Sequence, residues 1–201
     1  SIWQQFLDGL LQTRWYEFIA VLAGIGSVWF SKKENILVYP VGLVNTIIYI
    51  FISIKGHLYG EASVNLYYTI MSIYGWVLWA KRDEQRQHSI RISYSTGREW
   101  LSQLLFFGIF YVFIYTALTW LKKEFAPEAI PWADALASAS AYTGMWLMAR
   151  KKVESWYWWI ITNLASIPLY FIKGYVFTSF QFLVLLILAV AGLIAWKRKA
   201  L

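Results

Sequence analysis

Two asparagines stand near the middle of long apolar segments, where few other polar side chains are available. Asn45 lies in the segment 36–54 and Asn163 in the segment 156–172, 118 residues further along the chain. Polar groups inside a membrane are costly, so a residue of this kind is a candidate for binding a solute. The alternative is a cross-helix hydrogen bond, which contributes well under about 2 kcal/mol. The matched spacing favours solute contact for at least one of the two.

Other amide, hydroxyl and indole side chains could complete a site around these asparagines. Asn65 and Tyr68 lie on one face of the segment 62–80, and Gln181 lies within two residues of the position that matches Asn65 in the last segment. The remaining candidates are Tyr49, Tyr142, Trp156 and Trp159. Amides can bind carboxamide or hydroxyl groups, and aromatic faces stack on a ring or favour a delocalised cation. The set predicts a neutral or weakly cationic solute that contains a ring.

The apolar segments that hold these residues contain no catalytic or metal-binding groups near their middle. There is no cysteine, and no Asp, Glu or His stands at the middle of an apolar segment. An intramembrane hydrolase would need such groups inside its helices. We therefore predict a protein that is not an enzyme and that has neither metal nor cofactor. The lack of such groups also weakens the case for coupling transport to protons or sodium.

The composition predicts the elements that must position the candidate residues. Hydrophobic residues make up 59% of the chain and charged residues 14%, which is too apolar for an ordinary soluble surface. A helix needs about 20 apolar residues to cross a membrane. Seven segments approach that length, at 15–31, 36–54, 62–80, 100–121, 132–149, 156–172 and 174–196.

The chain repeats itself once, at an offset of 117–118 residues. The matched pairs are Trp15 and Trp132, Trp29 and Trp146, Asn45 and Asn163, Lys55 and Lys173, and Trp79 and Trp196. The offset covers four segments, three of the first copy and one connector, so both copies enter the membrane from the same side, which predicts parallel repeats. The expected fold is an all-α membrane protein with seven transmembrane helices, arranged as two parallel three-helix repeats joined by a connector helix (3+1+3).

This arrangement divides the chain into six parts. They are an interfacial amphipathic helix at 1–14, a first three-helix repeat at 15–80, a cytoplasmic loop at 81–99 that serves as a hinge or linker between the halves, a connector helix at 100–121, a second three-helix repeat at 132–196, and a basic cytoplasmic tail at 197–201. Two prolines, Pro40 and Pro168, fall in corresponding segments, where each is either a gating hinge or a static bend.

The net charge of +7 is distributed as a topology signal and does not indicate nucleic acid. With seven crossings, thirteen of the eighteen basic residues fall on one side of the membrane. The excess of Lys and Arg on cytoplasmic loops then puts the N-terminus outside and the C-terminus in the cytoplasm. Trp79 and Trp196, next to basic residues, are interpreted as anchors at the interface with membrane lipid.

Four runs of residues form a recognisable combination: Pro131-Trp132-Ala133-Asp134, the stretch from Arg150 to Trp156, the stretch from Ile167 to Gly174, and Tyr74-Gly75-Trp76 with Trp79. Together they resemble PnuC-type vitamin transporters over residues 15–199. The resemblance implies a facilitator of the bacterial inner membrane, similar in fold to SWEET sugar transporters. It implies nicotinamide riboside as the solute and a cytosolic ribosylnicotinamide kinase as the metabolic partner that traps it. Site residues implied by the resemblance are Asn45, Asn65, Tyr68, Trp159, Asn163 and Gln181.

Three other functions stay open at this point. A facilitator of the same family could carry thiamine or riboflavin, and a SWEET-like sugar transporter would share the repeats but tolerate fewer stacked tryptophans. A seven-helix receptor or sensor would bind a ligand without transport, although its shape would not require two equivalent halves. Assembly into a homo-oligomer is compatible with each of these functions.

Overall fold

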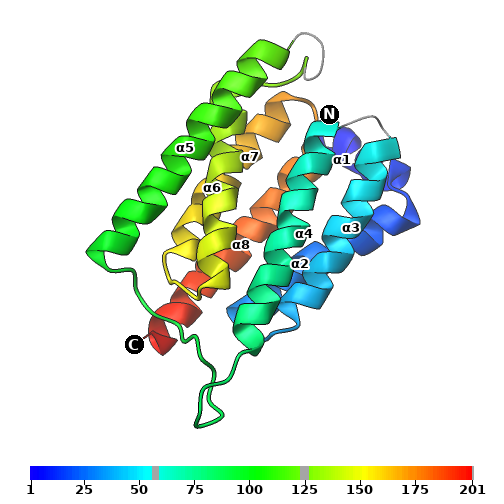
Figure 1. Ribbon diagram of the computed structural model, residues 1–201. Coiled ribbons are helices and arrows are strands. Elements are labelled where there is room, and N and C mark those ends of the chain that lie inside the picture. Colours follow the sequence, from blue (N-terminus) through cyan, green and yellow to red (C-terminus); the bar gives the residue numbers. More distant parts are fainter. Residues whose placement is uncertain (56–58, 123–126, 201) are drawn as a thin grey trace.

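The structure, a computed structural model, is built from α-helices (Figure 1). It describes residues 1–55, 59–122 and 127–200; Leu201, the end of the predicted basic tail, lies outside the described residues. Within these ranges there are eight helices: α1 (Ile2–Gln12), α2 (Trp15–Lys32), α3 (Val38–Lys55), α4 (Tyr59–Ala80), α5 (Gly97–Leu121), α6 (Pro131–Ala149), α7 (Ser155–Ile172) and α8 (Val176–Lys199).

Helices α2 to α8 coincide with the seven predicted segments, and each begins and ends within three residues of its predicted position. Among the described residues, three helices (α3, α5 and α8) are long and apolar enough to cross a membrane by length and composition alone. The others contain more Ala, Ser, Tyr and Trp, which lowers their hydropathy. The prediction of an all-helical membrane protein is confirmed, and the number of crossings stays a prediction.

The helices form two groups of three, with α5 on the outside (Figure 1). In the first group α3 packs between α2 and α4, and in the second α7 packs between α6 and α8. The two groups meet where α2 contacts α8 and where α4 contacts α6. The interface between the groups is therefore formed by α2, α4, α6 and α8.

Helix α6 is the most enclosed helix of the bundle because it contacts α4, α5 and α7. Its sequence allows this close approach, since small residues stand at nearly every second position, and Ala135 and Ala139 are fully buried. Small residues let helix backbones approach closely in membrane proteins. Helix α5 has no counterpart in the first group, which makes the second group the more buried half.

The loop between α4 and α5 is attached to the second group at its C-terminal part, and its role as a hinge or linker stays a prediction. Ser93 forms a parallel β-bridge with Lys152, and the backbone N–H of Ser95 donates to the buried carboxylate of Glu154 at 2.6 Å. Helix α5 then begins at Gly97, three residues before its predicted start, because Thr96 and Glu99 form a capping box. The loop lies at the same end of the bundle as the C-terminus, and the N-terminus lies at the other (Figure 1).

Two side-chain contacts fix the outer helices. On α5, the fully buried Gln103 accepts a hydrogen bond at 2.7 Å from the indole N–H of Trp158 on α7. On α1, Phe6 packs edge-on against Phe180 of α8 with ring centroids 5.2 Å apart. The rest of α1 is largely exposed, including Trp3 at 65%. Its placement on a membrane surface stays a prediction.

Candidate functional site

The two groups of helices match at a constant offset of 117 residues. Adding 117 to the bounds of α3 gives 155–172, the bounds of α7, and the same offset takes the start of α4 at residue 59 to the start of α8 at residue 176. Residues related by this offset make equivalent contacts in several places. The contacts at the end of the bundle near the C-terminus are the most complete set.

Two glycines at this end allow two large rings to pack against helices. A Cβ atom at Gly75 would overlap the ring of Tyr39, and a Cβ atom at Gly192 would overlap the ring of Trp156. Both the glycines and the rings are related by the offset of 117. Only glycine leaves room for these contacts, so the sequence specifies the same packing of α3 on α4 and of α7 on α8.

The two tryptophans next to these rings hydrogen-bond across the interface between the groups. The indole N–H of Trp79 donates to the backbone carbonyls of Met148 and Ala149 at 3.3 and 3.2 Å, and that of Trp196 donates to the carbonyl of Ser31 at 2.8 Å. Met148 and Ser31 are again 117 residues apart. An approximate two-fold axis between the groups would produce this reciprocal exchange. The side chains are only 2% and 0% exposed, so the prediction of lipid anchors is wrong.

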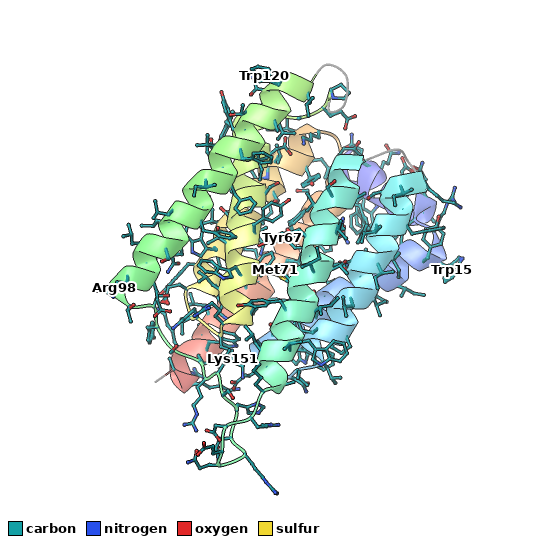
Figure 2. The ribbon with its side chains drawn as sticks, in the orientation of Figure 1. Trp15, Tyr67, Met71, Arg98, Trp120 and Lys151 are labelled. Atoms are coloured by element: carbon teal, nitrogen blue, oxygen red, sulfur yellow. The ribbon has the colours of Figure 1, made fainter. Side chains whose placement is uncertain are left out.

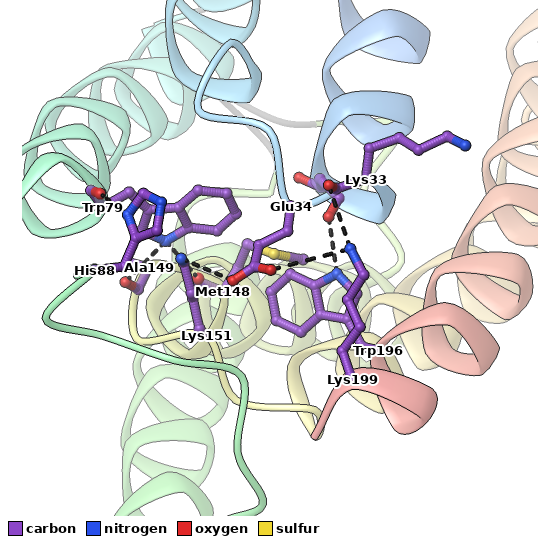
Figure 3. Close-up of polar contacts among 10 residues, drawn as sticks. Lys33, Glu34, Trp79, His88, Met148, Ala149, Lys151, Trp196 and Lys199 are labelled. Atoms are coloured by element: carbon purple, nitrogen blue, oxygen red, sulfur yellow. Dashed lines mark hydrogen bonds and ion pairs between the residues drawn. The ribbon is translucent and has the colours of Figure 1, made fainter. Parts of the chain in front are cut away.

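An ion pair joins the two equivalent turns at the same end. Lys151 Nζ lies 2.9 Å from Glu34 Oε2, and these residues occupy matching positions in the turns after α2 and α6, with φ of 54° and 55° (Figure 3). Lys151 is 1% exposed, and its Nζ lies 4.7 Å from the centroid of the Trp79 ring. We use the name end cluster for Glu34, Tyr39, Trp79, Lys151, Trp156 and Trp196.

At the middle of the bundle the two groups differ. The amide of Asn45 donates to the carbonyl of Ala20 at 2.6 Å, and the hydroxyl of Thr162 lies 3.3 Å from the carbonyl of Ala137. Ala20 and Ala137 are 117 residues apart, as are Asn45 and Thr162. The structural counterpart of Asn45 is therefore Thr162, and Asn163 lies one position further along.

Asn163 corresponds instead to Thr46, and its surroundings have lost the matching partner. The hydroxyl of Thr46 lies 3.0 Å from the hydroxyl of Thr69 on α4. The offset of 117 puts Leu186 of α8 where Thr69 stands in the first group, and leucine cannot hydrogen-bond through its side chain. Asn163 is 4% exposed, and its side chain forms no hydrogen bond with any residue that the structure describes. It is a buried amide available to a ligand.

Three tyrosines gather where α4 meets α6. The rings of Tyr67 and Tyr142 lie 4.4 Å apart, the hydroxyl of Tyr67 donates to the backbone carbonyl of Tyr142 at 3.2 Å, and the ring of Tyr68 lies 6.0 Å from that of Tyr142. Phe110 of α5 packs edge-on against Tyr142 at 5.3 Å from the outside. Figure 2 shows Tyr67 between the two helices. The structure thus brings together the predicted Tyr68 and Tyr142.

The other predicted residues are distributed over the bundle. Tyr49, Asn65 and Gln181 are half-buried on α3, α4 and α8. Trp159 is half-buried, with its ring against Gly144 of α6. Trp156 belongs to the end cluster, seven residues or about two helical turns from Asn163.

The two predicted hinge prolines have different structural settings. Pro40 is the third residue of α3, and the N–H groups of a first turn have no partner within the helix. Pro40 therefore breaks no hydrogen bond within the helix, and it cannot bend the helix in that way. Pro168 lies inside α7, where its missing N–H removes one bond from the helix. The hinge role stays a prediction for both, and at Pro40 it cannot arise from a broken bond.

Four contributors were missed in the sequence: Glu34, Lys151, Tyr39 and Tyr67. A signal existed for the first two, because the repeat offset of 117 aligns a glutamate with a lysine in two basic turns. Opposite charges at equivalent positions are able to pair across a two-fold axis. The two tyrosines carry no comparable signal among the many aromatic residues of the chain.

Comparison with known proteins agrees with this architecture. A family model described as nicotinamide mononucleotide transporter matches residues 14–198. The chain is 25% identical to the nicotinamide riboside transporter PnuC of Escherichia coli (strain K12), covering 92% of this chain and 86% of the relative. It is 23% identical to the riboflavin/roseoflavin transporter RibM of Streptomyces davaonensis, covering 90% of this chain and 84% of that one.

The fold is also similar to a solved structure. The crystal structure of the vitamin B3 transporter PnuC aligns with a TM-score of 0.72 and 22% identity, covering 98% of this chain and 87% of that chain. The resemblance found in the sequence is confirmed. These relatives are named as transporters, which also confirms the prediction that the chain is not an enzyme.

Proposed function

Because the chain belongs to the nicotinamide mononucleotide transporter family, we propose that it imports nicotinamide riboside across the bacterial inner membrane by facilitated diffusion. The observation that carries this proposal is the buried, unpartnered amide of Asn163 at the middle of α7. A carboxamide or a ribose hydroxyl would satisfy it, and the E. coli relative is named as a nicotinamide riboside transporter. The tyrosines at the contact of α4 with α6 offer ring faces near the same depth of the bundle.

The charge distribution supports a nucleoside over a nucleotide. The family description names the mononucleotide, whose phosphate would need Arg or Lys within reach. The basic residues of α2 to α8 all lie in the first or last turns of their helices. Nicotinamide riboside carries only a delocalised ring cation, which aromatic side chains can bind without a counter-charge.

The architecture that fits this function has seven crossings as 3+1+3, with α2–α4 and α6–α8 as parallel repeats and α5 as the connector. The basic loop 81–96 and the C-terminus lie at one end of the bundle, and the excess of positive charge makes that end cytoplasmic. Helix α1 then lies on the outer face of the membrane.

The end cluster is the cytoplasmic gate of an alternating-access cycle. Its contacts bridge the two groups reciprocally, through two indole hydrogen bonds and the Glu34–Lys151 pair. Rocking of one repeat against the other would break them together and open this end to the cytoplasm. No charged group at mid-helix couples the cycle to an ion, so phosphorylation of the solute by a cytosolic kinase maintains the inward gradient.

The site residues are arranged around Asn163 in this proposal. The predicted lining consists of Asn45, Tyr49, Asn65, Tyr68, Tyr142, Trp159 and Gln181. Of these, the amide of Asn45 is bonded to Ala20 and would have to exchange that bond for a solute. Trp156, within the end cluster, would act on the gate and not on the solute.

Binding and counterflow test the proposal. Nicotinamide riboside is titrated into purified protein by calorimetry, and exchange of labelled solute is followed in liposomes. Asn163→Ala should raise the Kd about tenfold or more, because a lost ligand hydrogen bond with a group left unpaired is worth about 1–3 kcal/mol. Thr162→Val, next along the same helix, removes a hydroxyl that already has partners and should change the Kd less than about twofold. Equal effects of the two variants would remove Asn163 from the site.

Riboflavin is the second candidate solute, because the relative RibM is named for it and covers nearly as much of the chain. Its uncharged ring system would use the same amide and tyrosine faces. Tight binding of riboflavin with none of nicotinamide riboside would select this alternative. Thiamine and a sugar serve as further ligands in the same titration.

A further inference from the structure

A separate pocket opens at the end of the bundle that carries the end cluster. Its volume is about 460 Å³, and its walls come from the end of α4, the following loop and the two turns that hold the ion pair. It is distinct from the mid-bundle residues assigned to the solute. Its lining includes the side chains of Glu34, Trp79, Arg82, His88 and Lys151.

The loop after α4 is folded so that two basic side chains share one face. Arg82 and His88 form an antiparallel β-bridge, and bridged residues project to the same side. The bridge is held by Asp83, whose carboxylate accepts from the backbone N–H groups of Gln85 and Gln87 at 3.0 and 2.8 Å. The arrangement is thus specified locally, by one aspartate at the turn.

The charges of the pocket are positive and incompletely paired. Arg82 is exposed and forms no ion pair with the described residues. Lys151 adds a buried ammonium in the wall, and His88 Nδ1 lies 3.3 Å from the carbonyl of Trp79, which leaves Nε2 for another partner. Among the described residues that line the pocket, Glu34 carries the single carboxylate, which is shared between Lys151 and Lys199, whose Nζ lies 4.0 Å away.

We propose that this pocket binds a phosphate group, carried either by a soluble phosphomonoester or by a lipid headgroup. The guanidinium fork of Arg82 matches the geometry of phosphate oxygens, and the imidazole of His88 lines the pocket beside it. Lys151 contributes positive charge from behind, in a wall of low dielectric. Glu34 opposes the anion, so it limits affinity and would be the group whose neutralisation tightens binding.

Titration of inorganic phosphate into the detergent-purified full chain tests the proposal, with the heat of binding recorded at constant ionic strength. Arg82→Gln should raise the Kd for phosphate at least fivefold, because hydrogen bonds to charged groups are stronger than those between neutral groups. The matched control Arg91→Gln removes an exposed arginine of the same loop that does not line the pocket, and should leave the Kd within twofold. Glu34→Gln should tighten phosphate about threefold, a gain that a merely structural role would not produce.

A second experiment distinguishes a lipid headgroup from a soluble phosphomonoester as the source of the phosphate group. In nanodiscs, a lipid-derived ligand predicts that phosphatidylglycerol weakens inorganic phosphate by competition relative to phosphatidylcholine, and a soluble ligand predicts equal affinity in both. Nicotinamide riboside binding, measured on the same samples, should be unaffected by Arg82→Gln, so failure of the solute proposal is recognised independently. Absence of phosphate binding in correctly folded wild type, or equal losses in Arg82→Gln and Arg91→Gln, would overturn the proposal.

Discussion

The ion pair of the end cluster predicts an unequal response to removal of its two charges. Glu34→Ala leaves Lys151 without a counter-charge in a position that is 1% exposed. Lys151→Met leaves Glu34, which is 27% exposed and has the Nζ of Lys199 at 4.0 Å. Solvent and the second lysine can compensate the charge of the glutamate, whereas among the described residues only the face of Trp79 remains to stabilise the charge of the lysine.

The magnitudes follow from this difference. Removing one partner of a buried ion pair costs about 3–5 kcal/mol, because the remaining charge stays buried and unpaired. We expect Glu34→Ala to lower the free energy of unfolding by about 3 kcal/mol, because the cation–π contact of Lys151 offsets part of the destabilisation. Lys151→Met should cost about 1 kcal/mol, as for a partly exposed pair. The double variant, with neither charge, should lie within about 1 kcal/mol of wild type, since apolar replacement of a buried pair is often neutral.

The assay is equilibrium unfolding in mixed micelles, followed by tryptophan fluorescence, for the wild type and the three variants. The double-mutant cycle then isolates the interaction between the two side chains from their separate effects. A coupling energy below about 0.5 kcal/mol, or a larger loss for Lys151→Met than for Glu34→Ala, would refute the reasoning that burial of the lysine governs the pair.

Two further contacts of the fold give predictions for unfolding free energies in the same assay. Gly192→Ala should cost about 1–3 kcal/mol because its Cβ overlaps a buried indole, whereas Gly108→Ala, which meets only open space, should be neutral or slightly stabilising; equal stabilities would contradict the packing. Trp158→Phe should cost about 1–2 kcal/mol because it leaves the buried amide of Gln103 without its 2.7 Å donor, and Trp120→Phe, at an 83% exposed position, should cost less than about 0.5 kcal/mol.

The positions of the helices could be predicted because long apolar runs form them. The ends of the helices depend on local capping residues. The start of α5 at Gly97 follows from Thr96 and Glu99, a capping pair that is visible in the sequence. The length of the loop 81–99 predicted a hinge or linker between the halves, but not that Ser93 of this loop would pair with Lys152 in the turn after α6. Pairing of segments far apart in the chain has no local signal, so it could not be predicted.

The tryptophans of the end cluster show where a composition rule fails. Trp79 and Trp196 stand beside basic residues, as interfacial anchors do, and the rule for anchors considers each helix alone. In the folded protein each indole N–H instead finds a carbonyl of the opposite group. The repeat itself contained the information, because equivalent residues near a two-fold axis are able to contact each other's group.

Matching identical residues also aligned the two repeats incorrectly by one residue at the middle of the bundle. Two asparagines 118 residues apart invited a match, but the helix bounds and the carbonyl partners require 117, which matches Asn45 with Thr162 and Asn163 with Thr46. The correction strengthens the case for Asn163, because an amide equivalent to Asn45 would have a partner on the neighbouring helix.

The end cluster is symmetric between the two groups of helices, whereas the middle of the bundle is asymmetric. A gate that opens by rocking two repeats needs equivalent contacts on both, and the end cluster has them in its rings, indole bonds and paired turns. A solute that lacks two-fold symmetry needs the opposite, since identical binding groups on both sides could not be satisfied at once. Leu186 stands in the second group where Thr69 stands in the first, and the side chain of Asn163 has no hydrogen-bond partner among the described residues. Under the proposed function, duplication would supply the motion, and divergence at this pair of positions would supply the recognition.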